Sequence, residues 1–439
     1  MVTTRHTSLL RGGRLPTSGY AVSNGPFRAV RGVRHTLERV SGSPAMSSTT
    51  SPMPRRSVLL ALIAAPLTVA ACSSDKPKPA TSSATTTPSS STTSATAAPP
   101  KVTGAGLPAD LLSVLTALYL GGKVGTVGTV GGVLGKRKTL GKPVKVTGTT
   151  GTWKGSQIAT VVQGKDVTLL VKDKTWKVVG GWWPSMSVSR AEFPTMRVLA
   201  IGSDARNPQP VTKCRGDALH IIGVDAKRGV GGIVGIPRDS WVPLSTGGNG
   251  KVNASLVFGG VDGMVKTVSR ASGVRIDGYV ITGFKGFRGM VRALGGIVLE
   301  ASKSLQSVDG FRIVKPGTNN LDAKHALAFA RERKHLSNGD FGRSANQGAL
   351  IKAGIAMARK AGPGSLARYL SRMSPYLSTD LSVGEVLNLC ASMYVNSSAA
   401  IPNKVVPGSI GTRERQSVVL LGSGARAIFN DMKNGGLSA

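Results

Sequence analysis

The stretch MRVLAIGSDARNPQPVTKCRGDALHIIGVDAKRGVGGIVGIP (residues 196–237) decides the fold class of this chain. It contains three short runs that are almost entirely apolar: MRVLAIGS, ALHIIGVDA and VGGIVGIP. Runs of this length without regular polar alternation are typical of strands that are buried on both faces of a sheet. Two further runs of the same kind, GYVITGF (278–284) and GIVLEA (296–301), follow along the chain.

Helical patterns lie between and after these runs. In FKGFRGMVRALGG (284–296), Phe287, Met290, Val291 and Leu294 fall on one face of a helix, and the residues after Gln347 repeat this spacing. Buried strands that are separated by helices predict an α/β fold. We therefore expect an α/β/α sandwich with a central mixed sheet over residues 196–438.

A small β-rich module is predicted ahead of the sandwich, over residues 101–185. It begins with the helical pattern LPADLLSVLTALYL (107–120) and continues with short β-type runs that are separated by Gly and Lys-Asp turns. Four of the five tryptophans of the chain lie in this module. We interpret them as core residues, the alternative being a sugar-binding face.

The segment ahead of the module has the pattern of an exported lipoprotein. Residues 46–72 predict a signal peptide, because Arg55 and Arg56 precede an apolar run that is too short to span a bilayer. The run ends in VAAC, which resembles a lipobox with Cys72 as the lipidated residue. Residues 73–100 form a Ser/Thr/Pro linker that cannot bury a core. We interpret residues 1–45 as a non-native leader, since signal peptides lie at the N-terminus.

The composition narrows the possible partners. Lys and Arg number 56 against 21 Asp and Glu, a formal net charge of +35, which favours a phosphate-rich partner such as nucleic acid, an anionic membrane surface or an anionic polymer. No nucleic acid is expected, because the sequence has no helix-turn-helix, zinc or RNA-binding signature. Five scattered histidines without an H-E-x-x-H motif argue against a zinc hydrolase. Whether Cys214 and Cys390 form a disulfide is left open.

Charged residues gather at the ends of the apolar elements in four stretches. These are IGSDAR (201–206), CRGDALHIIGV (214–224), GIPRDSWV (235–242) and ARERKHLSNGDFGRSANQ (330–347). Sites of α/β proteins form at strand ends. In the last stretch Arg331, Arg333 and Arg343 flank one short loop, and their guanidinium groups suit a shared phosphate. Because their mutual repulsion would be relieved, replacing Arg343 is expected to leave folding nearly intact or even to improve it.

Together these motifs carry a resemblance to a known family. Residues 196–359 resemble the LytR–CpsA–Psr family of cell-wall enzymes, on VLAIGSDAR, RGDALHIIGVD, IPRDSWV, GKVNASLVFGG, LDAKHALAFARER and GDFGRSANQ. The resemblance implies an enzyme on the extracytoplasmic face of the cell membrane. Such enzymes bind a polyprenyl-pyrophosphate-linked glycan and transfer its glycan phosphate to a peptidoglycan hydroxyl. The lipid anchor at Cys72 agrees with that location.

The resemblance also implies roles for particular residues. Asp204 and Asp217 match the acids that hold Mg²⁺. Arg238 matches a catalytic position, with Asp217 or Asp239 as the alternatives for the proton acceptor. The positions that match the family's pyrophosphate-binding side chains are Arg206, Arg215, Arg238, Arg331, Arg333, Arg343 and Gln347.

Two alternatives to this function remain open from the sequence. One is a polyprenyl-pyrophosphate-binding module or a pyrophosphatase that transfers nothing. The other is a transcriptional regulator, which the basic charge suggests and the exported-lipoprotein pattern opposes. The sequence does not identify the glycan, so arabinogalactan, teichoic acid and capsular polymer are equally open.

Overall fold

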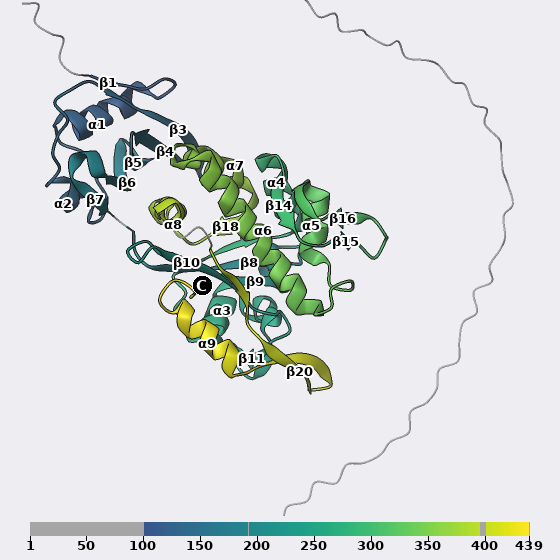
Figure 1. Ribbon diagram of the computed structural model, residues 1–439. Helices are drawn as coiled ribbons and strands as arrows, with labels where there is room; N and C mark the ends of the chain where they lie inside the picture. The colour runs from purple at the N-terminus through teal and green to yellow at the C-terminus, as the bar shows by residue number, and fades with distance from the viewer. Residues whose placement is uncertain (1–100, 192, 396–400, 439) are drawn as a thin grey trace, which may run out of the picture. The chain divides into compact units, whose positions relative to one another are not determined.

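A six-stranded mixed sheet forms the centre of the fold in the computed structural model, which describes residues 101–191, 193–395 and 401–438 (Figure 1). Its strand order is β18-β13-β8-β9-β10-β19. β13 and β8 are parallel, β8, β9 and β10 are antiparallel in turn, and β10 and β19 are parallel. The strands are β8 (Met196–Ser203), β9 (Gly216–Asp225), β10 (Val230–Gly235), β13 (Gly278–Thr282), β18 (Ser378–Thr379) and β19 (Asn403–Val405).

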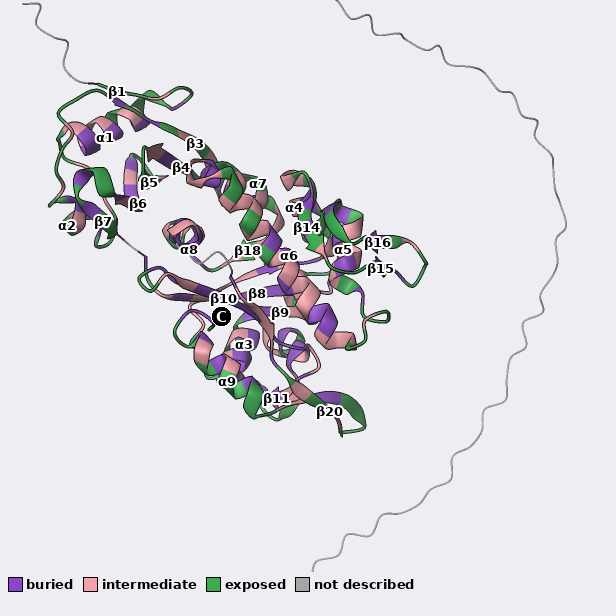
Figure 2. Cartoon of the chain, in the orientation of Figure 1, coloured by how far each residue is buried: buried purple, intermediate pink, exposed green. Residues whose placement is uncertain are grey.

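Helices cover both faces of this sheet, as the apolar runs predict. Leu199 and Leu219 point to one face, where they share a core with helices α3 (Ser255–Ser272) and α9 (Ser423–Met432). Val198 and Val224 point to the other face and pack in a core with α8 (Val383–Val395). Figure 2 shows buried residues along β8, β9 and β10 between these layers. The expected α/β/α sandwich with a central mixed sheet is therefore confirmed.

A smaller layer of helices and hairpins continues the face that carries the long helix α6 (Gly339–Ala361). Its own core includes Val291, Leu299, Phe329 and Leu350. The run GIVLEA forms a strand as expected, but among the described strands it pairs only with β17 and lies outside the six-stranded sheet. This layer comprises α4 (Phe284–Leu294), β14 (Ile297–Ala301), β15 (Leu305–Gln306), β16 (Arg312–Val314), β17 (Gly317–Leu321) and α5 (Ala323–Arg331).

A five-stranded antiparallel sheet with the order β3-β4-β5-β6-β7 precedes the sandwich. Trp153, Trp176 and Trp183 are at most 3% exposed, which confirms that these tryptophans are core residues. Its elements are β1 (Val102–Thr103), α1 (Ala109–Leu120), α2 (Val130–Leu134), β2 (Val144–Lys145), β3 (Thr147–Trp153), β4 (Ser156–Gln163), β5 (Asp166–Lys172), β6 (Trp176–Trp183), η1 (Pro184–Met186) and β7 (Val188–Ala191).

The two sheets share a core through helix α7 (Leu366–Met373) and helix α8. Side chains of β3 and β5 pack with Leu366, Leu370 and Leu387. Asn388 Nδ2 also donates to the Val179 carbonyl oxygen at 2.9 Å. The five-stranded sheet continues beyond residue 185, because its last strand β7 ends at Ala191. The division into a module over 101–185 and a domain over 196–438 remains a prediction. Short 3₁₀ helices η4 (Pro363–Ser365) and η5 (Ser374–Tyr376) flank α7.

Two hairpins stand beside the end of β10. The first joins β11 (Trp241–Pro243) to β12 (Asn249–Lys251), and the second joins β20 (Gly408–Arg413) to β21 (Gln416–Leu421). A bridge between Ser240 and Val419 connects them, and the Val419 N–H donates to the Asp239 carbonyl oxygen at 2.9 Å. The hairpins therefore fix the backbone of the PRDSW segment. The 3₁₀ helix η3 (Val252–Ala254) directly follows β12, whereas η2 (Val211–Lys213) lies between β8 and β9.

Several sequence predictions concern residues that lie outside this description. The leader 1–45, the signal peptide 46–72 with Cys72, and the linker 73–100 all precede the described residues. Within the described part of the chain, no helix is both long and apolar enough to cross a bilayer. Cys214 and Cys390 are both free thiols, which answers the open question of their pairing.

Candidate active site

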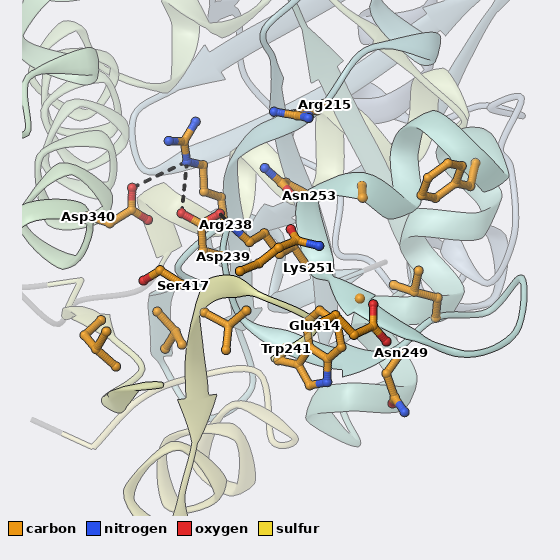
Figure 3. A pocket seen from close by; sticks show the side chains of 18 of the residues that line it. Arg215, Arg238, Asp239, Trp241, Asn249, Lys251, Asn253, Asp340, Glu414 and Ser417 are labelled. Atoms are coloured by element: carbon orange, nitrogen blue, oxygen red, sulfur yellow. Dashed lines mark ion pairs between the residues drawn. The ribbon is translucent and has the colours of Figure 1, made fainter. Parts of the chain in front are cut away.

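A cavity of about 770 Å³ opens where the PRDSW segment, the two hairpins, the start of α3 and the start of α6 meet (Figure 3). The central sheet positions Arg238 and Asp239, because β10 ends at Gly235 and the chain turns here. The α5–α6 connection brings Arg333 and Asp340 to the same place. The charged residues that line the cavity are Arg215, Arg238, Asp239, Lys251, Arg333, Asp340 and Glu414.

Arg238 is the centre of the charged cluster. Its Nη1 donates to Asp217, and its Nε lies 3.5 Å from Asp239 and 3.6 Å from Asp340. Burial lowers the pKa of Arg238, but the three carboxylates outweigh burial and hold that pKa above its usual value. The guanidinium therefore stays charged and ties together acids from three separate elements.

Two polar side chains from the segment before α3 complete the cluster. Lys251 Nζ lies 3.1 Å from Asp239 Oδ1. Asn253 Nδ2 donates to Asp217 Oδ1 at 3.1 Å. Both belong to the motif GKVNASLVFGG, and the turn through η3 points them at the acids. Asp217 and Asp239 are consequently held on two sides each.

Asp340 and Arg343 form a buried ion pair in the first turns of α6. Arg343 Nη2 lies 2.6 Å from Asp340 Oδ1, and the side chains are 8% and 16% exposed. Burial raises the pKa of Asp340, and the neighbouring carboxylates of Asp239 and Asp217 raise it further. Arg343 and Arg238 lower this pKa, but the net shift is upward. Burial likewise lowers the pKa of Arg343. Burial thus disfavours the charged form of each partner, and each depends on the other to remain charged.

This burial corrects the expectation that replacing Arg343 leaves folding intact. Arg343 is 7% exposed and has an acidic partner, so it is an interior cation rather than one of three exposed cations that repel each other. Removing it would leave Asp340 buried beside only one more distant cation, Arg238. Such a change destabilises the folded state.

Arg333 reaches the cavity from a tight turn that follows α5. Glu332 is 7% exposed, and its Oε1 accepts the backbone N–H groups of Arg333, Lys334 and His335 at 2.9, 2.8 and 3.1 Å. The Arg333 side chain itself is exposed. Among the described residues, neither Arg333 nor Arg215 forms an ion pair with an acid. The cavity wall therefore carries two uncompensated guanidinium groups.

The remaining predicted site residues lie away from the cavity lining. Arg331 ends α5 and stacks on Phe284, with its guanidinium carbon 4.8 Å from the ring centroid. Gln347 Nε2 donates to the Ala330 carbonyl oxygen at 3.0 Å and so joins α6 to the end of α5. Arg206 is exposed. Their roles in pyrophosphate binding stay predictions.

Asp204 braces the loop that carries Arg215. Its Oδ1 accepts the Arg215 N–H at 2.8 Å, and its own N–H donates to the Arg215 carbonyl oxygen at 2.9 Å. Ser203 of β8 pairs with Gly216 of β9, so Asp204 and Asp217 come from neighbouring strands at one edge of the sheet. The two acids that the resemblance assigns to Mg²⁺ thus stand at the same end of two adjacent strands.

The comparisons with known proteins agree with these motifs. The LytR_cpsA_psr family model matches residues 172–433, which is more than half of the chain. The chain belongs to the LytR–CpsA–Psr family. The matched range includes the whole cavity and begins within the second sheet, at the end of β5.

Curated relatives in this family are named as transferases. The chain is 31% identical over 207 residues to the polyisoprenyl-teichoic acid–peptidoglycan teichoic acid transferase TagU of Bacillus anthracis, covering 46% of this chain and 65% of that protein. It is 32% identical over 186 residues to the corresponding TagV of Bacillus subtilis, covering 40% of this chain and 48% of that protein. The chain thus spans less than two thirds of the length of these relatives.

Solved structures support the fold. A crystal structure of a Streptococcus agalactiae protein matches with a TM-score of 0.50 and 20% identity, over 56% of this chain and 90% of that chain. At this identity the likeness concerns the fold alone. It agrees with the α/β/α arrangement of this LytR–CpsA–Psr member.

Sequence reasoning missed three residues of the site: Lys251, Asn253 and Trp241. Lys251 and Asn253 belong to the motif GKVNASLVFGG, on which the family resemblance partly rests. The sequence could therefore have marked them as site residues, but it could not predict which acids they contact. Asp340 has an i,i+3 spacing to Arg343 on α6, a spacing at which side chains meet. Trp241 stands two residues after Asp239 in PRDSW, but a single tryptophan in a polar segment carries no directional signal.

The turn at Glu332 leads to a prediction on stability. Burial alone raises the pKa of Glu332, but the hydrogen bonds from His335, Lys334 and Arg333 outweigh it and hold that pKa below its usual value. Because the folded-state pKa is lowered, the ionised carboxylate stabilises the fold above the unfolded-state pKa of about 4.3, and this stabilisation is lost as the pH falls through the folded-state value. We expect Glu332→Gln to lower the free energy of unfolding by about 1–2 kcal/mol at pH 7.

Urea unfolding of the Glu332→Gln variant and the unmodified chain at pH 7 and about pH 4 measures this effect. The difference in the free energy of unfolding between the two proteins should be smaller at the lower pH. Glu300→Gln is the matched control, because Glu300 is exposed on β14. The role of the ionised carboxylate is contradicted if Glu332→Gln lowers the free energy of unfolding equally at both pH values. It is also contradicted if Glu300→Gln lowers this free energy by the same amount as Glu332→Gln.

Proposed function

We propose that this chain is an extracytoplasmic phosphotransferase that moves a glycan phosphate from a polyprenyl-pyrophosphate carrier to a peptidoglycan hydroxyl. The observation that carries the proposal is the cavity wall, where Arg215 and Arg333 face the opening without an acidic partner among the described residues. A diphosphate supplies the missing negative charge, and a guanidinium fork matches its oxygens two at a time. The names of the TagU and TagV relatives agree with this substrate class.

The proposed reaction is a displacement at phosphorus. The acceptor hydroxyl oxygen forms a bond to the phosphorus that carries the glycan, and the bond from that phosphorus to the bridging oxygen breaks. Polyprenyl monophosphate leaves, and the glycan is joined to peptidoglycan by a phosphodiester. Charge spreads over several oxygens in the transition state, so fixed cations supply most of the stabilisation. Arg238, Lys251 and Arg333 are placed around the cavity for this purpose.

The proton of the acceptor hydroxyl needs a carboxylate to receive it. Of the two acids that the sequence left open, Asp239 lines the cavity, whereas Asp217 is not part of the lining and holds Arg238 and Asn253. We therefore assign the proton acceptor to Asp239 and a positioning role to Asp217. Lys251 Nζ lies 3.1 Å from Asp239 Oδ1 and would help to hold this carboxylate in place.

Asp204 and Asp217 suit a Mg²⁺ ion in number and in chemistry. Mg²⁺ is usually bound in such sites by one or two carboxylates, with phosphate oxygens and water completing its shell. Within the described residues no cluster of three or more His, Cys, Asp or Glu side chains is placed to hold a metal, so substrate oxygens and water would have to complete the shell. Bound there, Mg²⁺ would neutralise part of the charge on the diphosphate. Asp217 would then exchange some of its contact with Arg238 for the ion.

The lipid anchor belongs to this proposal and has its own test. We expect Cys72→Ser to release the protein from the membrane fraction into the medium, because a short apolar signal gives no lasting anchor once it is cleaved. Immunoblots of membrane and medium fractions measure the distribution. Mass spectrometry of the native form should find a lipid on Cys72. An unlipidated form that still begins before residue 46 contradicts both the cleavage site and the leader interpretation.

The transfer reaction itself separates this proposal from its alternatives. A labelled polyprenyl-pyrophosphate disaccharide is incubated with the purified protein and peptidoglycan, and the products are analysed by mass spectrometry. The proposal predicts polyprenyl monophosphate and peptidoglycan-linked glycan phosphate in equal amounts. Release of polyprenyl monophosphate with free glycan phosphate would instead identify a pyrophosphatase. Binding without any product would identify a carrier-binding module.

A further inference from the structure

The cavity extends beyond the charged cluster into an end of different chemistry. Figure 3 shows Arg238, Asp239 and Asp340 grouped at one side, whereas Trp241, Asn249 and Glu414 gather at another. The two hairpins supply this second group. Lys251 stands between the groups, where it contacts Asp239. One continuous cavity therefore joins an anion-binding end to an end with an aromatic ring, an amide and a carboxylate.

The backbone holds this second end firmly against the first. Trp241 of β11 is the cross-strand partner of Lys251 on β12, so their side chains are neighbours on the small sheet. Glu414 occupies the turn of the β20–β21 hairpin in a left-handed conformation, with φ 48°. The same hairpin is bound to the PRDSW segment through the Val419 N–H and the Asp239 carbonyl oxygen. A ligand on Trp241 would therefore lie at a fixed offset from Asp239.

The chemistry of this end selects a class of ligand. Trp241 is half-buried and offers an apolar ring face, while the side chains of Asn249, Glu414, Gln416 and Ser417 are exposed around it. Amide, hydroxyl and carboxylate groups pair with hydroxyls, and a few such groups beside an aromatic surface fix the orientation of a ligand. A second phosphate would be repelled by Glu414, and an acyl chain would leave these polar groups unpaired. A sugar ring has an apolar face that can stack on Trp241, and its hydroxyls can form hydrogen bonds with the surrounding amide, hydroxyl and carboxylate groups.

We propose that Trp241, Asn249 and Glu414 form a saccharide subsite that holds one pyranose ring beside the charged cluster. The subsite deepens the proposed function and rests on it for the origin of the ring. That ring belongs either to the peptidoglycan acceptor, whose hydroxyl must reach the phosphorus, or to the first sugar of the donor glycan, which is bonded to the phosphate. Both sources present the same chemistry to Trp241.

Steady-state kinetics with both substrates separate the two sources. Transfer is measured for the unmodified chain, Trp241→Ala and Trp241→Phe, first with the polyprenyl-pyrophosphate disaccharide varied and then with soluble uncrosslinked peptidoglycan strands varied. Trp241→Ala removes one aromatic contact, so it should raise the KM for the substrate that supplies the ring by about tenfold. Trp241→Phe keeps an aromatic ring, so its KM should stay close to that of the unmodified chain. A rise for the strands assigns the acceptor, and a rise for the disaccharide assigns the donor.

A second measurement is independent of transfer. Saturation-transfer NMR with a β-1,4-linked N-acetylglucosamine tetrasaccharide reports direct binding to the unmodified chain and to Trp241→Ala. Phe311→Ala is the control, because Phe311 is a half-buried aromatic residue that is not part of the cavity lining. Thermal unfolding should be similar for the unmodified chain and the two Trp241 variants, since Trp241 is outside the main core clusters.

The outcomes divide cleanly between the subsite and the proposed function. If the unmodified chain transfers nothing but binds the tetrasaccharide through Trp241, the proposed function fails and the subsite stands. If both KM values and tetrasaccharide binding are unchanged in Trp241→Ala, the subsite is overturned whether or not transfer occurs. A lower kcat with both KM values unchanged and no Trp241-dependent binding also overturns it.

Discussion

Replacing Arg343 with alanine is expected to lower the free energy of unfolding by about 3 kcal/mol or more. The reason is the Asp340 carboxylate, which lies 2.6 Å from the Arg343 guanidinium and is only 16% exposed. Without Arg343 it would be a buried charge whose remaining cation, Arg238, is 3.6 Å away and already shared with two other acids. Chemical unfolding at pH 7 measures the loss.

A double-mutant cycle tests whether the ion pair causes this loss. Asp340→Asn combined with Arg343→Met removes both charges, so the double variant should be more stable than the single variant Arg343→Met. If the double variant is as unstable as the sum of the two single variants, the pair carries no coupling energy and the explanation fails. Arg343→Ala stability equal to that of the unmodified chain would contradict it directly.

Replacing Arg333 with alanine is expected to slow transfer about a hundredfold or more while leaving thermal stability nearly unchanged. Arg333 lines the cavity, is exposed and has no acidic partner among the described residues. An exposed charge without a partner contributes little to folding. A guanidinium that stabilises negative charge in the transition state contributes mainly to the rate. Initial rates and melting temperatures of the same preparations measure both effects.

Arg288→Ala is the matched control for Arg333→Ala. Arg288 is an exposed arginine on α4 and is not part of the cavity lining, so its replacement removes the same charge at a different place. We expect its rate to stay within about twofold of the unmodified chain, as for a surface charge. Equal losses in the two variants would mean that the rate responds to net charge rather than to a position in the cavity.

Continuous apolar runs explain why the central sheet could be predicted from the sequence. β8, β9 and β10 are buried on both faces, so their runs lack polar alternation and are distinctive. The run GIVLEA has a similar pattern, yet β14 has Val298 and Glu300 exposed, and in the part of the chain that the structure describes it pairs only with β17. Strand type follows from the local pattern, but the strand partner depends on tertiary packing.

The candidate site was predictable in its residue types and only partly in its geometry. Arg331 and Arg333 are two positions apart, but α5 ends between them, with Glu332 in an extended conformation. Arg331 consequently lies on Phe284, and Arg333 reaches the cavity. The burial of Arg343 and the approach of the β20–β21 hairpin depend on contacts between segments far apart in the chain, which no local pattern reports.

The most direct measurement is the affinity of the cavity for a diphosphate. Isothermal titration calorimetry compares a short polyprenyl diphosphate with the corresponding monophosphate, for the unmodified chain, Arg333→Ala and Arg288→Ala. If the diphosphate binds at Arg215 and Arg333, it should bind at least about tenfold more tightly than the monophosphate. Of the two variants, Arg333→Ala alone should lose this preference. Equal affinity for the two ligands in the unmodified chain, or a preference that survives in Arg333→Ala, would contradict the assignment of the cavity to a pyrophosphate carrier.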